Sequence, residues 1–447
     1  MLPVRLLFRL LLLLACLPLP SHAAGVAVPP LAFQQRTLAN GLTVITLEDH
    51  ASPTVSVQVW YRVGGKDDPA GRSGFAHLFE HMMFKRTKHM PAEQFDRLTE
   101  DVGGANNAQT GDDYTAYYEV VPSNHLERLL WAEAERMANL DVDDATFRSE
   151  RAVVQEEYRQ RVLANPYGRF YESFAPRSYT AHPYRNGTIG DIAQLDAASL
   201  DDVRAFHRTY YRPDNAVLIV TGDFEPKELD AWIDKYFGPL TNPATPIPRV
   251  TVAEPPRTRP AQYRETGPNV PLPAVALTWL APPARSPDAV ALQVAAAILG
   301  HGESSRMNQA LVYRGEIAQS ASFGADLRVD TGLLIAYAVA ASGHAPAELA
   351  RALRAEIAKL AAKPVGAAEL ARIRTQLVTA ALVERQTPMG KANALGEAAL
   401  VQGDVRRVNE EIAELQAVTA ADVQRVVRKY LIDAPAVTIE YAQEPRS

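Results

Sequence analysis

The feature that most constrains the fold is an internal repeat with an offset of 220 residues. The segment "DVRAFHRTYYRPDNAVLI", residues 202–219, aligns without a gap with "DVQRVVRKYLIDAPAVTI", residues 422–439. Each copy has the pattern of a helix followed by a short apolar strand. A repeat on this scale predicts that one structural unit is present twice in the chain.

The beginnings of the two halves also correspond. "PTVSVQVWYRVGG", residues 53–65, and "PLPAVALTWLAPP", residues 271–283, both contain an apolar strand pattern followed by a helix pattern. Strands and helices mix within each half without a strict alternation. We therefore expect an α+β fold of two homologous α/β-sandwich domains, each with a mixed sheet packed against helices. The 447 residues are too many for one ordinary core, which agrees with two domains.

The first 24 residues have the pattern of a secretory signal peptide. Two arginines precede an apolar run, and the small residues Ser21 and Ala23 fit a cleavage site. The run is too short for a comfortable membrane span. We expect a soluble periplasmic or secreted protein after cleavage. A lipoprotein attached through Cys16 is the less favoured alternative, because Leu14 is bulky for that kind of signal.

The net charge of the chain gives no indication of a nucleic-acid partner. The formal charge is −6 and the isoelectric point is about 6.0. Proteins that bind the phosphate backbone of a nucleic acid carry a basic patch or stripe on their surface. We therefore expect no nucleic-acid partner, and any function has to be argued from particular residues.

The stretch "FAHLFEHMMF", residues 75–84, carries ionisable side chains within an apolar helix pattern. His77 and His81 are four residues apart, so they are neighbours on one helix face and can both reach one Zn²⁺ ion. Glu80 lies close to the same face. Zinc lowers the pKa of a bound water molecule, so a carboxylate there can act as general base toward that water.

A catalytic zinc normally has three protein ligands and one open position. The candidate segment for the third ligand is "DDATFRSERAVVQEEYRQRVL", residues 143–163. Glu150 and Glu157 are seven residues apart and share one helix face, whereas Glu156 is rotated away by about 100°. Glutamates on helices are usually solvated, so these two are candidates for a functional role only because the histidines are also present.

The order His-x-x-Glu-His is the inverzincin signature. In this motif and four others the sequence strongly resembles the pitrilysin/insulinase family of zinc metallopeptidases. It is most similar to the short bacterial periplasmic proteases and to the mitochondrial processing peptidase. The five matching segments are "HLFEHMMFKRT" (77–87), "GGANNAQTGDDYTAYYEVVP" (103–122), "ERAVVQEE" (150–157), "HPYRNGTIGD" (182–191) and "YYRPDNAVLIVTGD" (210–223).

The resemblance implies a role for each residue of the candidate site. His77, His81 and Glu157 would be the zinc ligands, Glu80 would be the general base, and Glu150 would support catalysis. The implied activity is that of a zinc metalloendopeptidase acting on exported peptides or unfolded proteins. The alternative is a non-catalytic binding or scaffold subunit of a heterodimeric peptidase-like complex. A metal hydrolase of another class is disfavoured, because no glycine-lysine phosphate loop is present.

The segment at residues 103–122 reads as two strands joined by a polar hairpin. An extended peptide can add to an exposed edge strand through backbone hydrogen bonds. Members of the resembled family bind substrate in this way, which implies a substrate-binding role for Asn107 and Ala108.

The second half departs from the family pattern. Gln319 stands where the family often has a tyrosine that supports the oxyanion, and neither Arg306 nor Arg314 falls clearly at the position of the accompanying arginine. A two-half chain of the resembled family usually needs a second chain, so the resemblance implies a dimer. Either a related chain without the zinc motif supplies the arginine and the tyrosine, or Arg314 or another donor serves within a homodimer.

These patterns divide the chain into four parts. A proline-rich linker separates the two homologous halves, and the second half has no histidine or glutamate at the helix positions that match the zinc motif. The expected parts are a signal peptide (1–24), an N-terminal catalytic zinc-binding domain (25–240), the linker (241–262) and a C-terminal non-catalytic domain (263–447).

Overall fold

The structure is a computed structural model that describes residues 28–445. The expected signal peptide, including Cys16, lies outside these residues. Within them, no helix combines the length and the apolar character that crossing a bilayer requires.

The first sheet lies in the N-terminal half, and its strands follow the order β1-β2-β6-β3-β5-β4. β2 and β6 are parallel, and the other neighbours are antiparallel. β4 therefore lies at an edge of this sheet. The strands are β1 (Gln34–Thr37), β2 (Thr43–Glu48), β3 (Thr54–Tyr61), β4 (Ala105–Thr110), β5 (Thr115–Pro122) and β6 (Ala216–Gly222).

The second sheet repeats this topology in the order β7-β11-β8-β10-β9, with a parallel pair β7–β11 in the place of β2–β6. The other neighbours are again antiparallel. The α+β fold with two homologous sheets, expected from the repeat, is thereby confirmed. The strands are β7 (Ala261–Gly267), β8 (Ala274–Ala281), β9 (Ala318–Asp326), β10 (Gly332–Ala340) and β11 (Val437–Gln443).

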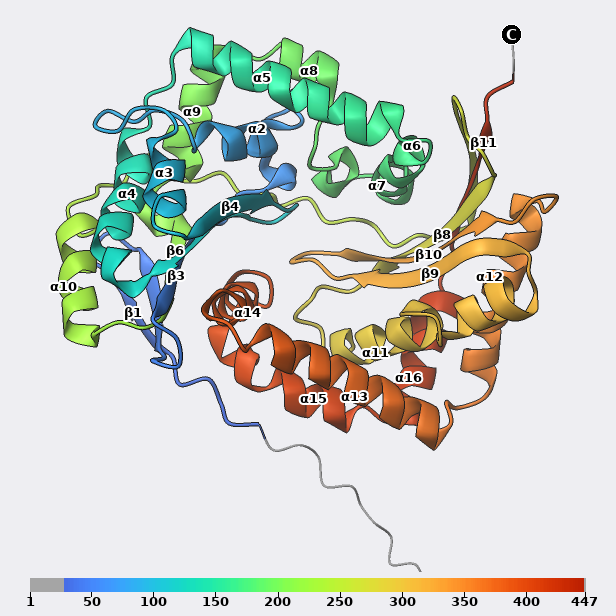
Figure 1. The fold of residues 1–447 in the computed structure, drawn as a ribbon. Helices are drawn as coiled ribbons and strands as arrows, with labels where there is room; N and C mark the ends of the chain where they lie inside the picture. Colours follow the sequence, from blue (N-terminus) through green and yellow to red (C-terminus); the bar gives the residue numbers. More distant parts are fainter. Residues whose placement is uncertain (1–27, 446–447) are drawn as a thin grey trace, which may run out of the picture. The chain divides into compact units, whose positions relative to one another are not determined.

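Helices pack against both sheets (Figure 1). Those of the first half are α2 (Phe75–Met82), α3 (Gln94–Glu100), α4 (Leu126–Asn139), α5 (Asp144–Tyr158), α6 (Gly168–Glu172), α7 (Phe174–Ser178), α8 (Ile192–Asp196), α9 (Leu200–Tyr210) and α10 (Pro226–Tyr236). Those of the second half are α11 (Ala289–Gly300), α12 (Pro346–Ala362), α13 (Ala367–Glu384), α14 (Pro388–Leu400), α15 (Glu411–Ala417) and α16 (Ala420–Val427). Short helical turns are η1 (Gly65–Asp67), η2 (Ser123–His125), η3 (Arg159–Ala164), η4 (Pro183–Asn186), η5 (Pro213–Asn215), η6 (Asn308–Arg314), η7 (Val405–Asn409) and η8 (Arg428–Ile432).

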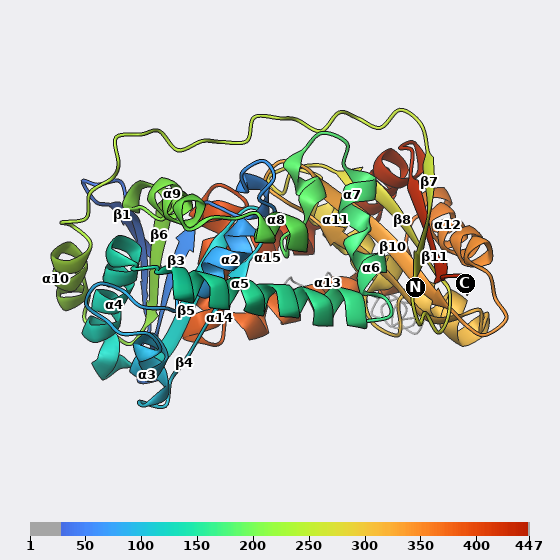
Figure 2. The ribbon, with the colours of Figure 1, turned by 90° about the horizontal axis from the view of Figure 1, so that it is seen from above.

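The two halves exchange helices. α2, α4 and α9 bury their apolar side chains on one face of the first sheet. The opposite face, with Trp60 and Ile219, is covered by Ala392 and Leu395 of α14, which comes from the second half. In return, α6 and α7 of the first half pack Phe170 and other side chains against the second sheet. The apolar core beside each sheet therefore contains side chains from both halves of the sequence. Between α10 and β7 the linker forms neither helix nor strand (Figure 2).

The last residue of α11, Gly300, lies against the backbone of β9. A Cβ atom at Gly300 would stand 1.9 Å from the amide nitrogen of Phe323, so the helix or the strand would have to move. We expect Gly300→Ala to lower the free energy of unfolding by about 1–3 kcal/mol, the usual cost of overpacking. Urea denaturation measures this change. The control is Gly324→Ala, where a Cβ meets nothing within 4 Å. Equal stability of the two variants would contradict this description of the packing.

Candidate metal centre

The helix α2 is fixed at its beginning by a glycine and a buried carboxylate. Gly74 has φ +94°, and a Cβ there would stand 2.9 Å from Cα of Gly190, so the close approach and the backbone angle both require glycine. Asp68 accepts hydrogen bonds from the amides of Gly74 (2.6 Å) and Ala76 (2.8 Å). These bonds satisfy amides that have no partner within the helix and orient α2.

The apolar side of α2 faces the core of the first half. The side chains of Phe75, Leu78, Phe79 and Met82 are fully buried there. The helical period leaves His77, Glu80 and His81 on the remaining surface, which faces away from that apolar cluster. Packing of the apolar stripe therefore determines where the ionisable stripe points.

The helix α5 supplies the other side of the site. Its N-cap is Asp143, whose side chain accepts a hydrogen bond from the amide of Thr146 at 2.7 Å. Phe147 and Val154 anchor α5 in the same apolar core as α2. The two helices are in contact, and Glu150 and Glu157 face the histidines of α2.

Three side chains from these two helices converge on one point. Nε2 of His77 and Nε2 of His81 each lie 3.4 Å from Oε2 of Glu157. One nitrogen or oxygen atom from each residue lies within 4.8 Å of the others. Among residues 28–445 this is the one group of three or more histidine, cysteine, aspartate or glutamate side chains with such an arrangement.

The chemistry of these donors fits a zinc ion. Two imidazole nitrogens and a carboxylate oxygen are a common ligand set for catalytic zinc. Burial, together with the neighbouring His81, lowers the pKa of His77 to about 4. Its imidazole is therefore neutral at physiological pH, which is the form that coordinates a metal.

Further charged groups contact these three side chains. Oε1 of Glu157 forms an ion pair with the guanidinium of Arg161 at 2.7 Å, and the other oxygen, Oε2, points toward the histidines. Glu150 lies 3.7 Å from Nδ1 of His81 and 3.1 Å from Nζ of Lys85. Burial alone would raise the pKa of Glu150, but His81 and Lys85 lower it. A carboxylate beside the second nitrogen of a ligand histidine orients its ring.

Glu80 lies next to this group and is held from a different element. Its Oε2 accepts a hydrogen bond of 2.6 Å from the hydroxyl of Thr110, the last residue of β4. Burial raises the pKa of Glu80, and the bond from Thr110 opposes that effect. The side chain is half-buried, so it remains accessible to water.

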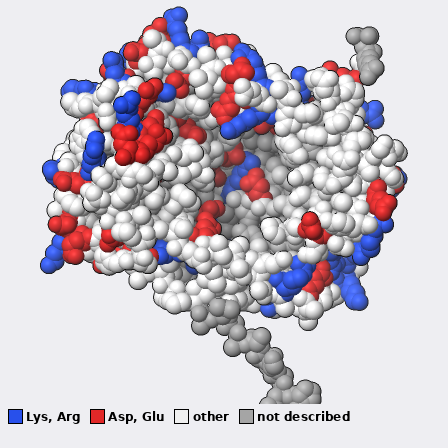
Figure 3. All heavy atoms as spheres, in the orientation of Figure 1, with Lys and Arg blue, Asp and Glu red and all other residues white. Residues whose placement is uncertain are grey.

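The residues expected to bind substrate lie on β4, the edge strand that ends at Thr110. Asn107 is exposed and Ala108 is 8 % exposed. The Ala108 amide donates to the side-chain oxygen of Asn107 at 2.8 Å. One face of the molecule is hollowed, and both acidic and basic side chains line the hollow (Figure 3).

The described part of the second half, up to residue 445, contains no counterpart of this site. The helix α11, which follows β8 as α2 follows β3, has only apolar residues, glycine and one glutamine. Arg306 forms a two-pronged ion pair with Glu369, at 2.9 and 2.7 Å. Gln319 and Arg314 are exposed.

Four residues around the site, Thr110, Lys85, Arg161 and Asp68, were not predicted from the sequence. Lys85 and Arg161 stand four residues beyond His81 and Glu157, so helical spacing would have indicated them. The contact of Thr110 with Glu80 joins a strand to a helix, and no periodicity in the sequence indicates such a pair.

The chain is thus of a kind with two similar α/β halves, one of which brings two histidines and one glutamate together. Two family models match the chain. The model described as "Insulinase (Peptidase family M16)" matches residues 43–187, and the model described as "Peptidase M16 inactive domain" matches residues 197–377. The chain belongs to the M16, or pitrilysin/insulinase, family of peptidases.

Several relatives resemble the chain over most of its length. "Zinc protease PqqE" of Helicobacter pylori is 29% identical over 90% of this chain and 91% of its own. "Probable mitochondrial-processing peptidase subunit beta" of Arabidopsis thaliana is 27% identical over 89% of this chain and 76% of its own. A crystal structure of a protease from Helicobacter pylori has a TM-score of 0.88 and 28% identity, covering 93% of this chain and 100% of its own. Homologues named as zinc proteases place this chain in a peptidase family.

Proposed function

We propose that this protein is a zinc-dependent metalloendopeptidase that hydrolyses peptide bonds in exported peptides or unfolded proteins. The observation that carries the proposal is the convergence of His77, His81 and Glu157 beside the carboxylate of Glu80. The edge position of β4, next to this carboxylate, supports a peptide as the substrate, because an extended peptide can add to such a strand.

In this proposal His77, His81 and Glu157 hold the zinc ion. When bound there, zinc supplies Lewis acidity that polarises a carbonyl oxygen and makes a water molecule more acidic. Oε1 of Glu80 takes the proton of the attacking water, because Oε2 is engaged by Thr110. Glu80 then delivers this proton to the leaving amine nitrogen. Asn107 and Ala108 bind the peptide backbone along β4.

The test is a substrate panel with and without metal. We expect the purified protein to cleave casein fragments, to lose this activity on treatment with a chelator, and to regain it when zinc is added. Small esters and phosphoesters should not be hydrolysed at comparable rates. Peptide hydrolysis that persists after complete removal of the metal would contradict the proposal. Stoichiometric zinc without any peptide hydrolysis would instead support the scaffold alternative.

We also propose that residues 1–24 direct export to the periplasm or outside the cell, and that the mature protein works as a dimer. The signal-like sequence supports export. Gln319, in place of a family tyrosine, supports a second chain that contributes to the site. Light scattering of the purified chain, alone and with a related chain lacking the motif, tests the dimer.

A further inference from the structure

We propose that Thr110 is a positioning residue, whose hydroxyl fixes the Glu80 carboxylate in the orientation needed to accept a proton. This inference rests on the proposed peptidase function and adds a residue to it. It also connects the edge strand β4 with the general base.

The contact between the two residues is short and specific. The Thr110 hydroxyl donates to Oε2 of Glu80 at 2.6 Å, within the range of charge-assisted hydrogen bonds. A glutamate side chain has three rotatable bonds, so without a partner its carboxylate samples several positions. The described residues give Oε1 no hydrogen bond, so this oxygen is available for water.

The turn that follows β4 fixes the backbone that carries the Thr110 side chain. Thr110 forms the last pair of the β4–β5 hairpin with Thr115, and the Gly111 amide donates to the carbonyl of Tyr114 at 2.8 Å. The carbonyl of Gly111 accepts a bond of 3.0 Å from the amide of Gly65. The turn is therefore joined to the segment that leads into α2.

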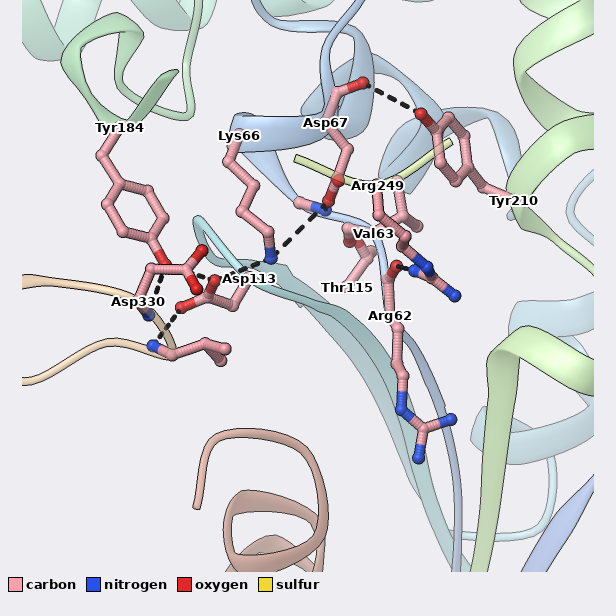
Figure 4. A network of polar contacts seen from close by, with 12 residues as sticks. Arg62, Val63, Lys66, Asp67, Asp113, Thr115, Tyr184, Tyr210, Arg249 and Asp330 are labelled. Carbon is pink, nitrogen blue, oxygen red and sulfur yellow. Dashed lines mark hydrogen bonds and ion pairs between the residues drawn. The ribbon is translucent and has the colours of Figure 1, made fainter. Parts of the chain in front are cut away.

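A buried carboxylate in the same turn connects it to three other segments. Oδ1 of Asp113 accepts from Nζ of Lys66 at 2.7 Å and from the Tyr184 hydroxyl at 2.5 Å (Figure 4). Oδ2 of Asp113 accepts from the Val329 amide of the second half at 3.0 Å. Asp113 is 8 % exposed and Tyr184 is fully buried. Such a satisfied buried network is rigid, so the end of β4 is well fixed.

The position of Thr110 on β4 gives the contact a functional meaning. A peptide added to β4 would take its register from this strand, and the carboxylate that acts on the peptide would take its position from the same strand. The same strand then positions both the general base and the peptide bond to be cleaved. Proton transfer requires that these two groups are held in the right geometry relative to each other. A structural role alone would not require the partner of Thr110 to be Glu80.

The experiment compares Thr110→Val with Thr110→Ser in the full chain loaded with zinc. Valine keeps the shape but has no donor, so we expect kcat for peptide hydrolysis to fall about 10- to 100-fold. KM and zinc content should not change, because neither the peptide nor the metal uses this hydroxyl. Thr110→Ser should restore kcat to near the wild-type value. Crystal structures should show the Glu80 carboxylate in several positions in Thr110→Val and in one position in Thr110→Ser.

The matched control is Thr115→Val in the same hairpin. Thr115 also donates through its hydroxyl, but it is fully buried and its partner is the carbonyl of Val63 at 2.9 Å. This variant should lower the denaturation midpoint and leave kcat unchanged. It therefore separates loss of a hydrogen bond in the hairpin from loss of the bond to Glu80.

The possible failures can be distinguished. Wild-type kcat in Thr110→Val, in a protein whose hydrolysis requires zinc and Glu80, would overturn this inference and leave the proposed function intact. Loss of zinc in Thr110→Val, or failure of Thr110→Ser to restore kcat, would also overturn it, since the role would then be structural. A wild-type protein without any zinc-dependent peptide hydrolysis would overturn both.

Discussion

Replacing Glu80 by glutamine is expected to lower the rate of peptide hydrolysis by roughly 10²–10⁴-fold, the contribution typical of a positioned general base. Glutamine has nearly the same size, and its side-chain oxygen can still accept the hydrogen bond from Thr110. It cannot take a proton from water. Because Glu80 is not among the three converging donors, the zinc content should stay the same.

The measurement is kcat/KM on a casein-derived peptide, together with zinc analysis of the same preparation. A Glu80→Gln protein that keeps both zinc and the wild-type rate would contradict the assignment of the base. Loss of zinc in this variant would show instead that Glu80 helps to hold the metal.

Replacing Glu157 by glutamine is expected to remove zinc from the protein. Loss of a residue that merely supports a metal ligand costs about 10–100-fold in affinity, so loss of the ligand itself should cost more than about 100-fold. Oε2 of Glu157 lies 3.4 Å from both imidazoles, and among the described residues no other carboxylate forms such a three-residue cluster with them. Competition with a chromogenic zinc chelator measures the change in affinity.

Glu156→Gln is the control for this prediction. Glu156 is adjacent in the sequence, but its side chain is 55% exposed and pairs with Arg159 at 3.2 Å. This variant should bind zinc and hydrolyse peptides like the wild type. Equal zinc affinity in Glu156→Gln and Glu157→Gln would contradict the assignment of the third ligand.

The duplication could be predicted from the sequence because matching segments conserve both the elements and their order. The segment at 202–219 contains most of α9 and the beginning of β6, and the segment at 422–439 contains most of α16 and the beginning of β11. The exchange of helices could not be predicted. Ala392 and Leu395 show only that one side of α14 is apolar, and such a stripe does not indicate which sheet it will cover.

The candidate site, too, could be predicted from the sequence only in part. Helical periodicity predicted that His77 and His81 share a face, and that Glu150 and Glu157 share another, because both patterns lie within single helices. The resemblance to a known family was needed to choose between the two glutamates. The contact of Thr110 with Glu80 depends on how a hairpin packs against a helix, which no local pattern contains.

The proposed activity depends on His77, His81 and Glu157 holding one zinc ion together. The most direct test is anomalous X-ray scattering at the zinc absorption edge, from crystals of the zinc-loaded protein. We expect a single strong peak within coordination distance of both Nε2 atoms and of Oε2 of Glu157. A peak elsewhere, or full zinc occupancy with the Glu157 carboxylate turned away from the ion, would contradict it.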